Sequence, residues 1–360
     1  MIYNILDANL EPIGDIDDAI SLIWDKHYRA EGYVEIYAAA TPRTVALLQE
    51  GHYITRDDDK HVARIYSIAT DTTEDDGEVI VAAAKFAHYV LGRRIIWNTT
   101  NTEGKAEEVA RSLIVDNCMA PTDKRGNSMP ARIIPELALG ELSGLPDEME
   151  ATQVSYVNLL EYILEICATF HYGLRAIMNT DNKIAIEFYT GTDRSYRQEQ
   201  NNFVAFSQEN ENLLGFSYKY DESTKVNAAL IGGEGEGIDR KLAQIGTAAG
   251  LERFEVFVDA KDVASTTENR DGTQQTYTAE QYNMLLEERG RLNMTPASES
   301  FDASVDLTRS YQYRKDFDVG DIVTIYDQRT GVYVNVRLMS VLETEDASGY
   351  TLTPTFAIDF

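Results

Sequence analysis

The chain has 360 residues, of which 43% are hydrophobic and 26% are charged, with 60 acidic residues against 32 basic ones and a formal net charge of −28. This length predicts two to four domains, and the composition is typical of a folded soluble protein. The acid excess argues against a surface that grips DNA or RNA, which needs a basic stripe, and against binding to an anionic membrane.

The start of the chain shows no targeting signal. Met1 is followed by neither a basic segment nor an apolar run, and no stretch approaches about 18 uninterrupted apolar residues, so we expect no membrane span and synthesis and folding in a cytoplasm. Cys118 and Cys167 are the only cysteines. Both lie among apolar residues and are interpreted as buried thiols, because two cysteines cannot build a disulfide framework.

Residues 1–90 are predicted to be mostly strands that form a first small β-barrel. Residues 33–37 alternate between apolar and polar side chains, as a half-buried strand does. Gly51 opens a meander with strands at 53–55, 64–68 and 78–81, a turn at 56–60, and an acidic turn that ends at Gly77. Residues 82–89 are predicted to begin a short helix.

Residues 91–200 are predicted to form an α+β domain. Apolar side chains recur at helical spacing over 105–119 and again over 157–167, where Ser155 is the expected cap. Gly173 marks the end of the second helix. Two apolar runs, 174–178 and 183–188, flank the polar residues 179–182, which is a hairpin signal.

The remainder is predicted to form a second, discontinuous β-barrel over 201–237 and 310–360, interrupted by a small α/β insertion over 238–309. Strands are expected at 203–206, 214–220, 226–231 and 254–258. The polar stretch 264–277 has the composition of a loop and is predicted to be the most mobile internal segment. Thr278 and Gln281 form a capping box for a helix. The predicted class is therefore α+β and multidomain.

The closing segment repeats the meander of the first barrel. Gly320 and Asp321 open it, strands follow at 322–326, 332–341 and 350–353, and an acidic turn ends at Gly349. The string that begins at Arg337 has the order Arg-x-x-Ser-apolar, as does the string that begins at Arg64. The shared string predicts an internal duplication.

No motif predicts catalysis, a cofactor or a metal. The five histidines form no His-Glu-x-x-His pattern, and the glycine-rich turn 232–237 lacks the Lys-Ser/Thr ending of a phosphate loop. The acidic run 71–78 has Asp76 where a calcium loop requires glycine. We therefore predict that the protein is not an enzyme and binds no cofactor.

Several short strings occur together in order along the chain. They are Leu91-Gly92-Arg93-Arg94, Gly191-Thr192-Asp193-Arg194, Asn201-Asn202, Val204-Ala205-Phe206-Ser207, Phe254-Glu255-Val256-Phe257-Val258-Asp259 and Asp316-Phe317-Asp318-Val319-Gly320-Asp321-Ile322-Val323. In this order the chain resembles the tail-tip (baseplate) hub proteins of long-tailed phages and prophages, the amino-terminal, Tal-like module of tail-associated proteins. That family is similar to the central hub of contractile-tail baseplates.

The resemblance implies a homotrimer with two tail-tube-like barrels in each subunit, each followed or interrupted by an α/β insertion. Six barrels would form a pseudo-sixfold ring that caps the tail tube at the virion tail tip, after synthesis in the host bacterial cytoplasm. The implied partners are the distal tail or tail-tube ring, the tape-measure protein and a separate tail fibre or receptor-binding protein. The predicted duplication independently supports six units in a trimer, because closed rings need matching contacts.

Two other functions stay open at this stage. A tail-associated cell-wall hydrolase would require a cleft with two close carboxylates. A host-receptor or carbohydrate-binding module would require exposed aromatic residues, for which the chain offers Trp24, Trp97 and 21 tyrosines.

The acid excess suggests how a channel for the tape-measure protein and DNA could release its cargo. Carboxylates on an inner face would repel the duplex, so DNA would pass without specific binding. The predicted channel-lining acids lie in the turns of the two meanders: Asp57, Asp58, Asp59, Glu343, Glu345 and Asp346. The alternative is that these acids only solubilise the outer surface.

Overall fold

The computed structural model describes residues 2–268 and 274–359, which divide into two compact units. The first unit contains Met1–Leu214 and Val305–Phe360, and the second contains Gly215–Ser304. The predicted division into four domains, 1–90, 91–200, 201–237 with 310–360, and 238–309, stays a prediction. The units are therefore described one at a time.

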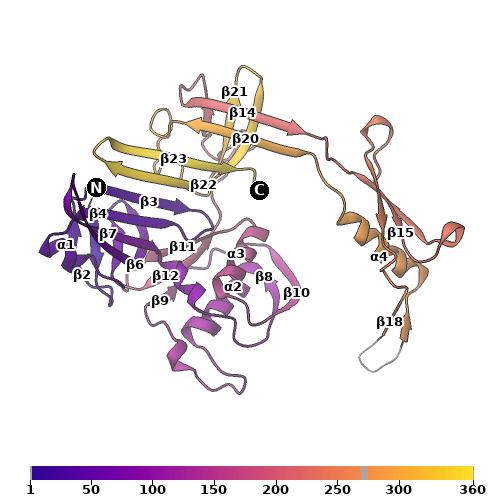
Figure 1. The fold of residues 1–360 in the computed structure, drawn as a ribbon, viewed down its shortest axis with the longest axis horizontal. Helices are drawn as coiled ribbons and strands as arrows, with labels where there is room; N and C mark the ends of the chain where they lie inside the picture. Colours follow the sequence, from indigo (N-terminus) through magenta and orange to yellow (C-terminus); the bar gives the residue numbers. More distant parts are fainter. Residues whose placement is uncertain (1, 269–273, 360) are drawn as a thin grey trace. The chain divides into compact units, whose positions relative to one another are not determined.

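The first unit is mainly β-structure (Figure 1). Its strands are β1 (Tyr3–Leu6), β2 (Pro12–Ile16), β3 (Ser21–His27), β4 (Tyr33–Ala39), β5 (Tyr53–Arg56), β6 (Asp59–Thr73), β7 (Gly77–Phe86), β8 (Thr100–Lys105), β9 (Leu137–Leu139), β10 (Glu148–Val154), β11 (Gly173–Met178), β12 (Ile184–Tyr189), β13 (Ala205–Ser207), β21 (Ile322–Asp327), β22 (Val332–Asp346) and β23 (Gly349–Ala357). Its α-helices are α1 (Pro42–Leu47), α2 (Ala106–Ile114) and α3 (Leu159–Thr169). Shorter helical turns cover Ala87–Arg93, Val115–Met119 and Pro130–Arg132.

One sheet runs through this unit in the order β13–β21–β22–β3–β4–β7–β6–β11–β12–β9, with β1, β2, β5 and β23 attached beside it. Strand β22 of the second meander pairs with β3, which precedes the first meander in the chain, so that Glu343 lies opposite Trp24. Because of this pairing the two meanders share one sheet. Among the described residues no sheet closes on itself, so the two barrels stay a prediction, whereas the mixture of strands and helices agrees with the predicted α+β class.

The core of residues 3–86 lies on one face of this sheet. Alternate side chains of β3, β4 and β7 are buried, among them Trp24, Ile36 and Ala84, and the predicted strand at 33–37 is confirmed as part of β4. The prediction of a helix beginning within 82–89 is wrong for its first half. The same inward alternation continues through Phe86 and keeps β7 paired, and a 3-10 turn begins only at Ala87.

Helices α2 and α3 form a second core with the β11–β12 hairpin. The predicted helix at 105–119 and the predicted hairpin are confirmed. Ser155 is not the cap of α3. Asn158 takes that role, because its side chain accepts hydrogen bonds from the backbone N–H of Leu160 at 3.0 Å and of Glu161 at 3.2 Å.

The second unit is built around the three-stranded sheet β16–β15–β17, with helix α4 packed against it (Figure 1). Its elements are β14 (Leu213–Asp221), β15 (Ala228–Gly232), β16 (Leu242–Ile245), β17 (Glu255–Asp259), β18 (Thr266–Glu268), β19 (Gln274–Thr276), α4 (Ala279–Arg291) and β20 (Ser298–Val305), with 3-10 turns at Gly237–Asp239 and Gly250–Glu252. The capping box at Thr278 and Gln281 is confirmed. The predicted loop 264–277 instead contains the paired strands β18 and β19, and its residues 269–273 lie outside the described residues.

Within the described ranges, no helix is both long enough and apolar enough to cross a membrane.

Candidate functional site

The two meanders, β5–β6–β7 and β21–β22–β23, share one backbone geometry at their opening glycines. The N–H of Gly51 donates to the carbonyl of Ile65 at 3.0 Å, and the N–H of Gly320 donates to the carbonyl of Leu338 at 2.8 Å. The two glycines have φ angles of 89° and 101°. This left-handed conformation favours glycine, which explains the residue type at both positions.

The central strands of the two meanders are also irregular at the same place in their shared string. In β6 the pairing register shifts between Ile65 and Ser67, and in β22 it shifts between Leu338 and Ser340. A bulge of this kind bends its strand and increases the local twist. The two meanders are therefore equivalent in local structure, and their origin by duplication stays a prediction.

The arginines that begin the two strings have different partners. Arg64 donates to the hydroxyl of Tyr89 at 3.2 Å and is half-buried. Arg337 is buried, and it donates to the carbonyl of Gly320 at 2.7 Å and to the carboxylate of Asp359 at 3.1 Å. Arg337 therefore secures the opening turn of its own meander through a hydrogen bond, whereas the guanidinium of Arg64 lies beside Gly51 and donates to Tyr89.

The other motif residues also hold backbone positions. Asp321 accepts hydrogen bonds from the N–H of Thr192 at 2.7 Å and from Arg194 Nε at 2.8 Å, which ties the loop before β13 to the second meander. Gly77 and Gly349 begin β7 and β23 with φ angles of 72° and 120°. These residues shape the meanders and present no reactive group.

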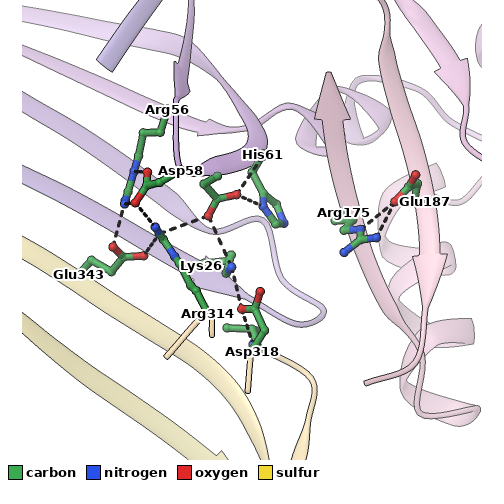
Figure 2. A network of polar contacts seen from close by, with 11 residues as sticks. Lys26, Arg56, Asp58, His61, Arg175, Glu187, Arg314, Asp318 and Glu343 are labelled. Carbon is green, nitrogen blue, oxygen red and sulfur yellow. Dashed lines mark hydrogen bonds and ion pairs between the residues drawn. The ribbon is translucent and has the colours of Figure 1, made fainter. Parts of the chain in front are cut away.

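A buried cluster of ion pairs joins the first meander to the second (Figure 2). Arg56, at the end of β5, donates to Glu343 of β22 at 3.0 Å and to Asp58 at 2.9 and 2.8 Å. Arg314 reaches both Glu343 and Asp58 from the segment before β21. The side chains of Arg56 and Glu343 are 0% and 2% exposed, so these charges are neutralised by one another and not by water.

The same cluster continues through Asp59. This carboxylate pairs with His61, with Lys26 Nζ at 3.5 Å and with Arg314 at 3.3 Å, and Lys26 also contacts Asp318 at 2.8 Å. Burial works to raise the pKa of Asp59, but the contacts with His61 and Lys26 outweigh it and hold this pKa well below its usual range. Burial likewise opposes the charge on Lys26, and Asp59 and Asp318 together raise its pKa. Asp59 and Lys26 are thus both charged at neutral pH.

This arrangement bears on the six predicted channel-lining acids. Asp58, Asp59 and Glu343 are engaged with arginine and lysine within the subunit. Glu345 lies opposite Leu22, on the same face of the sheet as Glu343. The remaining two, Asp57 and Asp346, are exposed and accept hydrogen bonds from Asn4 and Ser348 respectively. A channel-lining role for these acids stays a prediction, and three of them do not offer an unpaired charge.

The face of the sheet opposite to the one that carries Glu343 is open to solvent. On this face, one row of side chains crosses six strands from β23 to β6, and each residue of the row is the register partner of the next. The row consists of Thr351, Thr344, Ile23, Glu35, Ala83 and Ser67. All six are partly or fully exposed. We call the face that carries this row the open face. Small and hydroxyl-bearing side chains predominate on it, including Thr353 and Thr355 of β23.

Sequence reasoning did not find the cluster or the open face. Lys26 and Arg314 carried no local signal, because each is far in sequence from its acidic partners. The alternation in β3 and β4 did indicate one exposed face, but the order of the six strands that makes it continuous depends on long-range pairing. In the described ranges no group of three or more His, Cys, Asp or Glu residues could hold a metal ion.

The fold of the chain is that of prophage tail proteins. The 43 kDa tail protein of prophage MuSo2 from Shewanella oneidensis has a similar structure, with a TM-score of 0.55 at 11% sequence identity over 99% of this chain and 98% of that one. A tail protein from Neisseria meningitidis MC58 has a TM-score of 0.50 at 11% identity, over 98% of this chain and 95% of that one. No curated protein sequence matches the chain.

The chain belongs to the Siphovirus ReqiPepy6 Gp37-like protein family, whose sequence pattern matches residues 2–356. The family match and the shared fold together identify a phage tail protein of the tail-tip or baseplate kind. The resemblance stated from the sequence is confirmed at this level.

Proposed function

We propose that the protein is the structural hub of a phage tail tip, in which three copies form a pseudo-sixfold ring that caps the tail tube. The observation that carries the proposal is the equivalence of the two meanders. Both have the same glycine turn and the same bulge, and both lie in one sheet. A trimer would then present six similar meanders to a sixfold tube, which resolves the mismatch in symmetry.

The open face is the surface proposed to line the channel for the tape-measure protein and DNA. Its row, which contains Thr, Ser and Ala together with Ile23 and Glu35, has no basic residue to offer to phosphates. Lys85, which lies two residues after Ala83 on β7 and so on this face, is paired with Glu31. Neutral hydroxyl groups together with the overall charge of −28 would let a duplex slide without being held.

The partners proposed for this hub are the tail-tube or distal tail ring, the tape-measure protein and a separate fibre or receptor-binding protein. The role is proposed to be structural, without catalysis. Because the cluster around Glu343 joins its carboxylates to arginines, it resembles a structural clamp more than a pair of carboxylates set for hydrolysis.

The decisive experiment measures mass in solution and DNA binding together. Three copies of the 40.4 kDa chain should give a particle of about 121 kDa by light scattering or native mass spectrometry, with or without added tail-tube protein. A fluorescent duplex should remain unbound at physiological salt. A chain that stays monomeric with the tube protein present, or that binds the duplex tightly, would overturn the proposal.

A further inference from the structure

Strand β10 (Glu148–Val154) has one edge that no other strand covers. Among the described residues β10 pairs only with β8, and the two form a separate sheet of two strands. The free edge of such a strand presents backbone N–H and C=O groups that can pair with another chain. Proteins often protect this kind of edge with proline or lysine, and β10 contains neither. The edge is therefore chemically able to accept a further strand.

A bulge changes the local geometry of β10. Its pairing with β8 shifts register between Met149 and Thr152, so that Glu150 and Ala151 together lie opposite Glu103. A bulge of this kind re-aims side chains, and both Glu150 and Ala151 are exposed. Bulges also limit nonspecific pairing at sheet edges, which favours a specific partner over aggregation.

A groove of about 520 Å³ lies between β10 and helix α3. Residues 148–152 form one wall, and residues of α3 and its C-terminal end, between 162 and 170, form the other. Successive side chains of a strand point to opposite faces, so a groove over one face would meet only every second residue. Since five consecutive residues line this groove, it runs along the edge of β10. We call it the β10 groove.

The floor of the β10 groove is apolar. Ile166 is buried, and Met149, Tyr162 and Phe170 are partly buried against the core that contains α2 and α3. An added strand would direct every second side chain onto this floor. Sheet edges that bind peptides combine backbone hydrogen bonds with pockets for alternate side chains, and the β10 groove offers both features.

The walls of the β10 groove carry unpaired negative charge. Strand β10 and helix α3 contain four glutamates and no basic residue. Glu148 lies opposite Lys105 of β8, which can neutralise it. Glu150 and Glu165 line the groove, both are exposed, and neither forms an ion pair among the described residues. A segment that fits between these two carboxylates must bring positive charge.

We propose that the β10 groove binds an extended segment of another protein, which adds to β10 as a further strand and carries basic and apolar residues in alternation. Its backbone would bond to the free edge of β10, its apolar side chains would lie on the floor, and its basic side chains would meet Glu150 and Glu165. A second copy of this chain is a poor donor of such a segment, because its net charge is also −28. The proposal does not depend on the trimer.

The first test measures the binding of a model peptide to the full chain. The probe is a fluorescein-labelled heptapeptide in which lysine and valine alternate, and its anisotropy should saturate at one peptide per chain at physiological salt. The double variant Glu150→Lys, Glu165→Lys should weaken this binding by about tenfold or more, since two attractions become repulsions. The matched control is Glu141→Lys, Glu199→Lys. It changes the net charge equally at two exposed glutamates outside the groove, and it should change the affinity by less than about threefold.

A second test distinguishes strand addition from charge attraction alone. Methyl groups on two adjacent central peptide nitrogens remove a donor from each edge of the added strand, so this peptide should bind at least about tenfold more weakly. When the unmodified peptide binds, backbone amides within residues 148–152 should exchange with deuterium more slowly. A peptide in which glutamate replaces lysine should not bind. Circular dichroism shows whether each variant is folded.

Several results would overturn the proposal. It fails if the lysine–valine peptide does not bind, or if the N-methylated form binds equally well. It fails equally if both double variants weaken binding to the same extent, because the attraction would then come from the overall charge. Unchanged amide exchange at residues 148–152 would place the peptide elsewhere and would refute the β10 groove as its site. None of these results bears on the mass of the particle, so the proposed hub is tested separately.

Discussion

The buried ion cluster makes a quantitative prediction for Glu343→Gln. The carboxylate accepts hydrogen bonds from Arg56 at 3.0 Å and from Tyr350 at 2.8 Å, and it also pairs with Arg314. The substitution keeps the shape but removes the charge between two guanidinium groups. Removing one partner of a buried pair costs about 3–5 kcal/mol, because the remaining charge is left uncompensated. For a domain above about 200 residues this corresponds to a fall in Tm of about 6–10 °C, at about 2 °C per kcal/mol.

The measurement is thermal and urea unfolding of the full chain, followed by tryptophan fluorescence, to which Trp24 and Trp97 contribute. Arg56 lies 5.0 Å from the ring of Trp24, so this fluorescence reports on the cluster. Asp15→Asn is the control. Asp15 and Arg43 form a pair at 3.3 Å in the same unit, but both side chains are about half exposed, and such pairs contribute less than about 1 kcal/mol.

The reasoning fails if Glu343→Gln is no more destabilising than Asp15→Asn. In that case the ion pairs of the cluster would form as a result of folding without contributing to the free energy of unfolding. A rise in stability would be equally informative, because it would show that desolvation of the charges outweighs their attraction.

Two further predictions concern a buried histidine and a close backbone contact. Burial lowers the pKa of His88 from 6.5 to about 4, so the stability that its neutral form contributes is fully present above about pH 6.5 and is lost as the pH falls to about 4. Urea unfolding of the wild type should therefore show a loss of about 3 kcal/mol over this pH range that is absent in His88→Met. Equal losses in both proteins would contradict this sign. A Cβ on Gly191 would lie 1.9 Å from the carbonyl oxygen of Gly320, so Gly191→Ala should lower the free energy of unfolding by more than about 2 kcal/mol. The control Gly92→Ala, whose Cβ would have its nearest contact at 3.5 Å, should change this free energy by less than about 1 kcal/mol. Equal effects in the two variants would show that the backbone at Gly191 and Gly320 can move apart.

The sequence predicted the local elements of this fold well and their extents less well. Strands β6 and β22 were expected from short runs of alternating residues, yet both are 15 residues long. The distal half of β6 continues through Asp71 and Thr72, which are exposed polar residues paired with β7, and periodicity misses a part of a strand that buries no apolar side chain. Strand β22 continues past residue 341 through Glu343, whose side chain is buried but polar and so adds nothing to the apolar pattern.

The cap of α3 shows a different limit. Ser155 and Asn158 are both good capping residues, and the sequence does not reveal which one will point at the free N–H groups. Tyr156 adopts a φ of 61°, which turns the chain before the helix and leaves Asn158 in the capping position. The choice therefore depends on backbone direction and not on residue type.

The ion cluster could not be predicted from the sequence at all. The acids Asp58, Asp59 and Glu343 were identified by their density in two turns, and that density was read as exposed charge. Arg314 neutralises them from a segment that precedes β21, and its approach depends on the pairing of β22 with β3. Charge density in a sequence says little about burial until the sheet order is known.

The pairing of β22 with β3 also constrains how the chain can fold during its synthesis. Residues 21–27 form a strand whose partner lies at 340–345, so one edge of β3 stays unpaired until the ribosome has passed residue 345. The intervening second unit can fold early, and it adds little closure entropy, because this entropy grows only with the logarithm of the loop length. Contacts so distant in sequence slow folding and leave a strand edge open to other nascent chains. Any assembly that needs the finished sheet is thereby delayed until residues 340–345 have been translated.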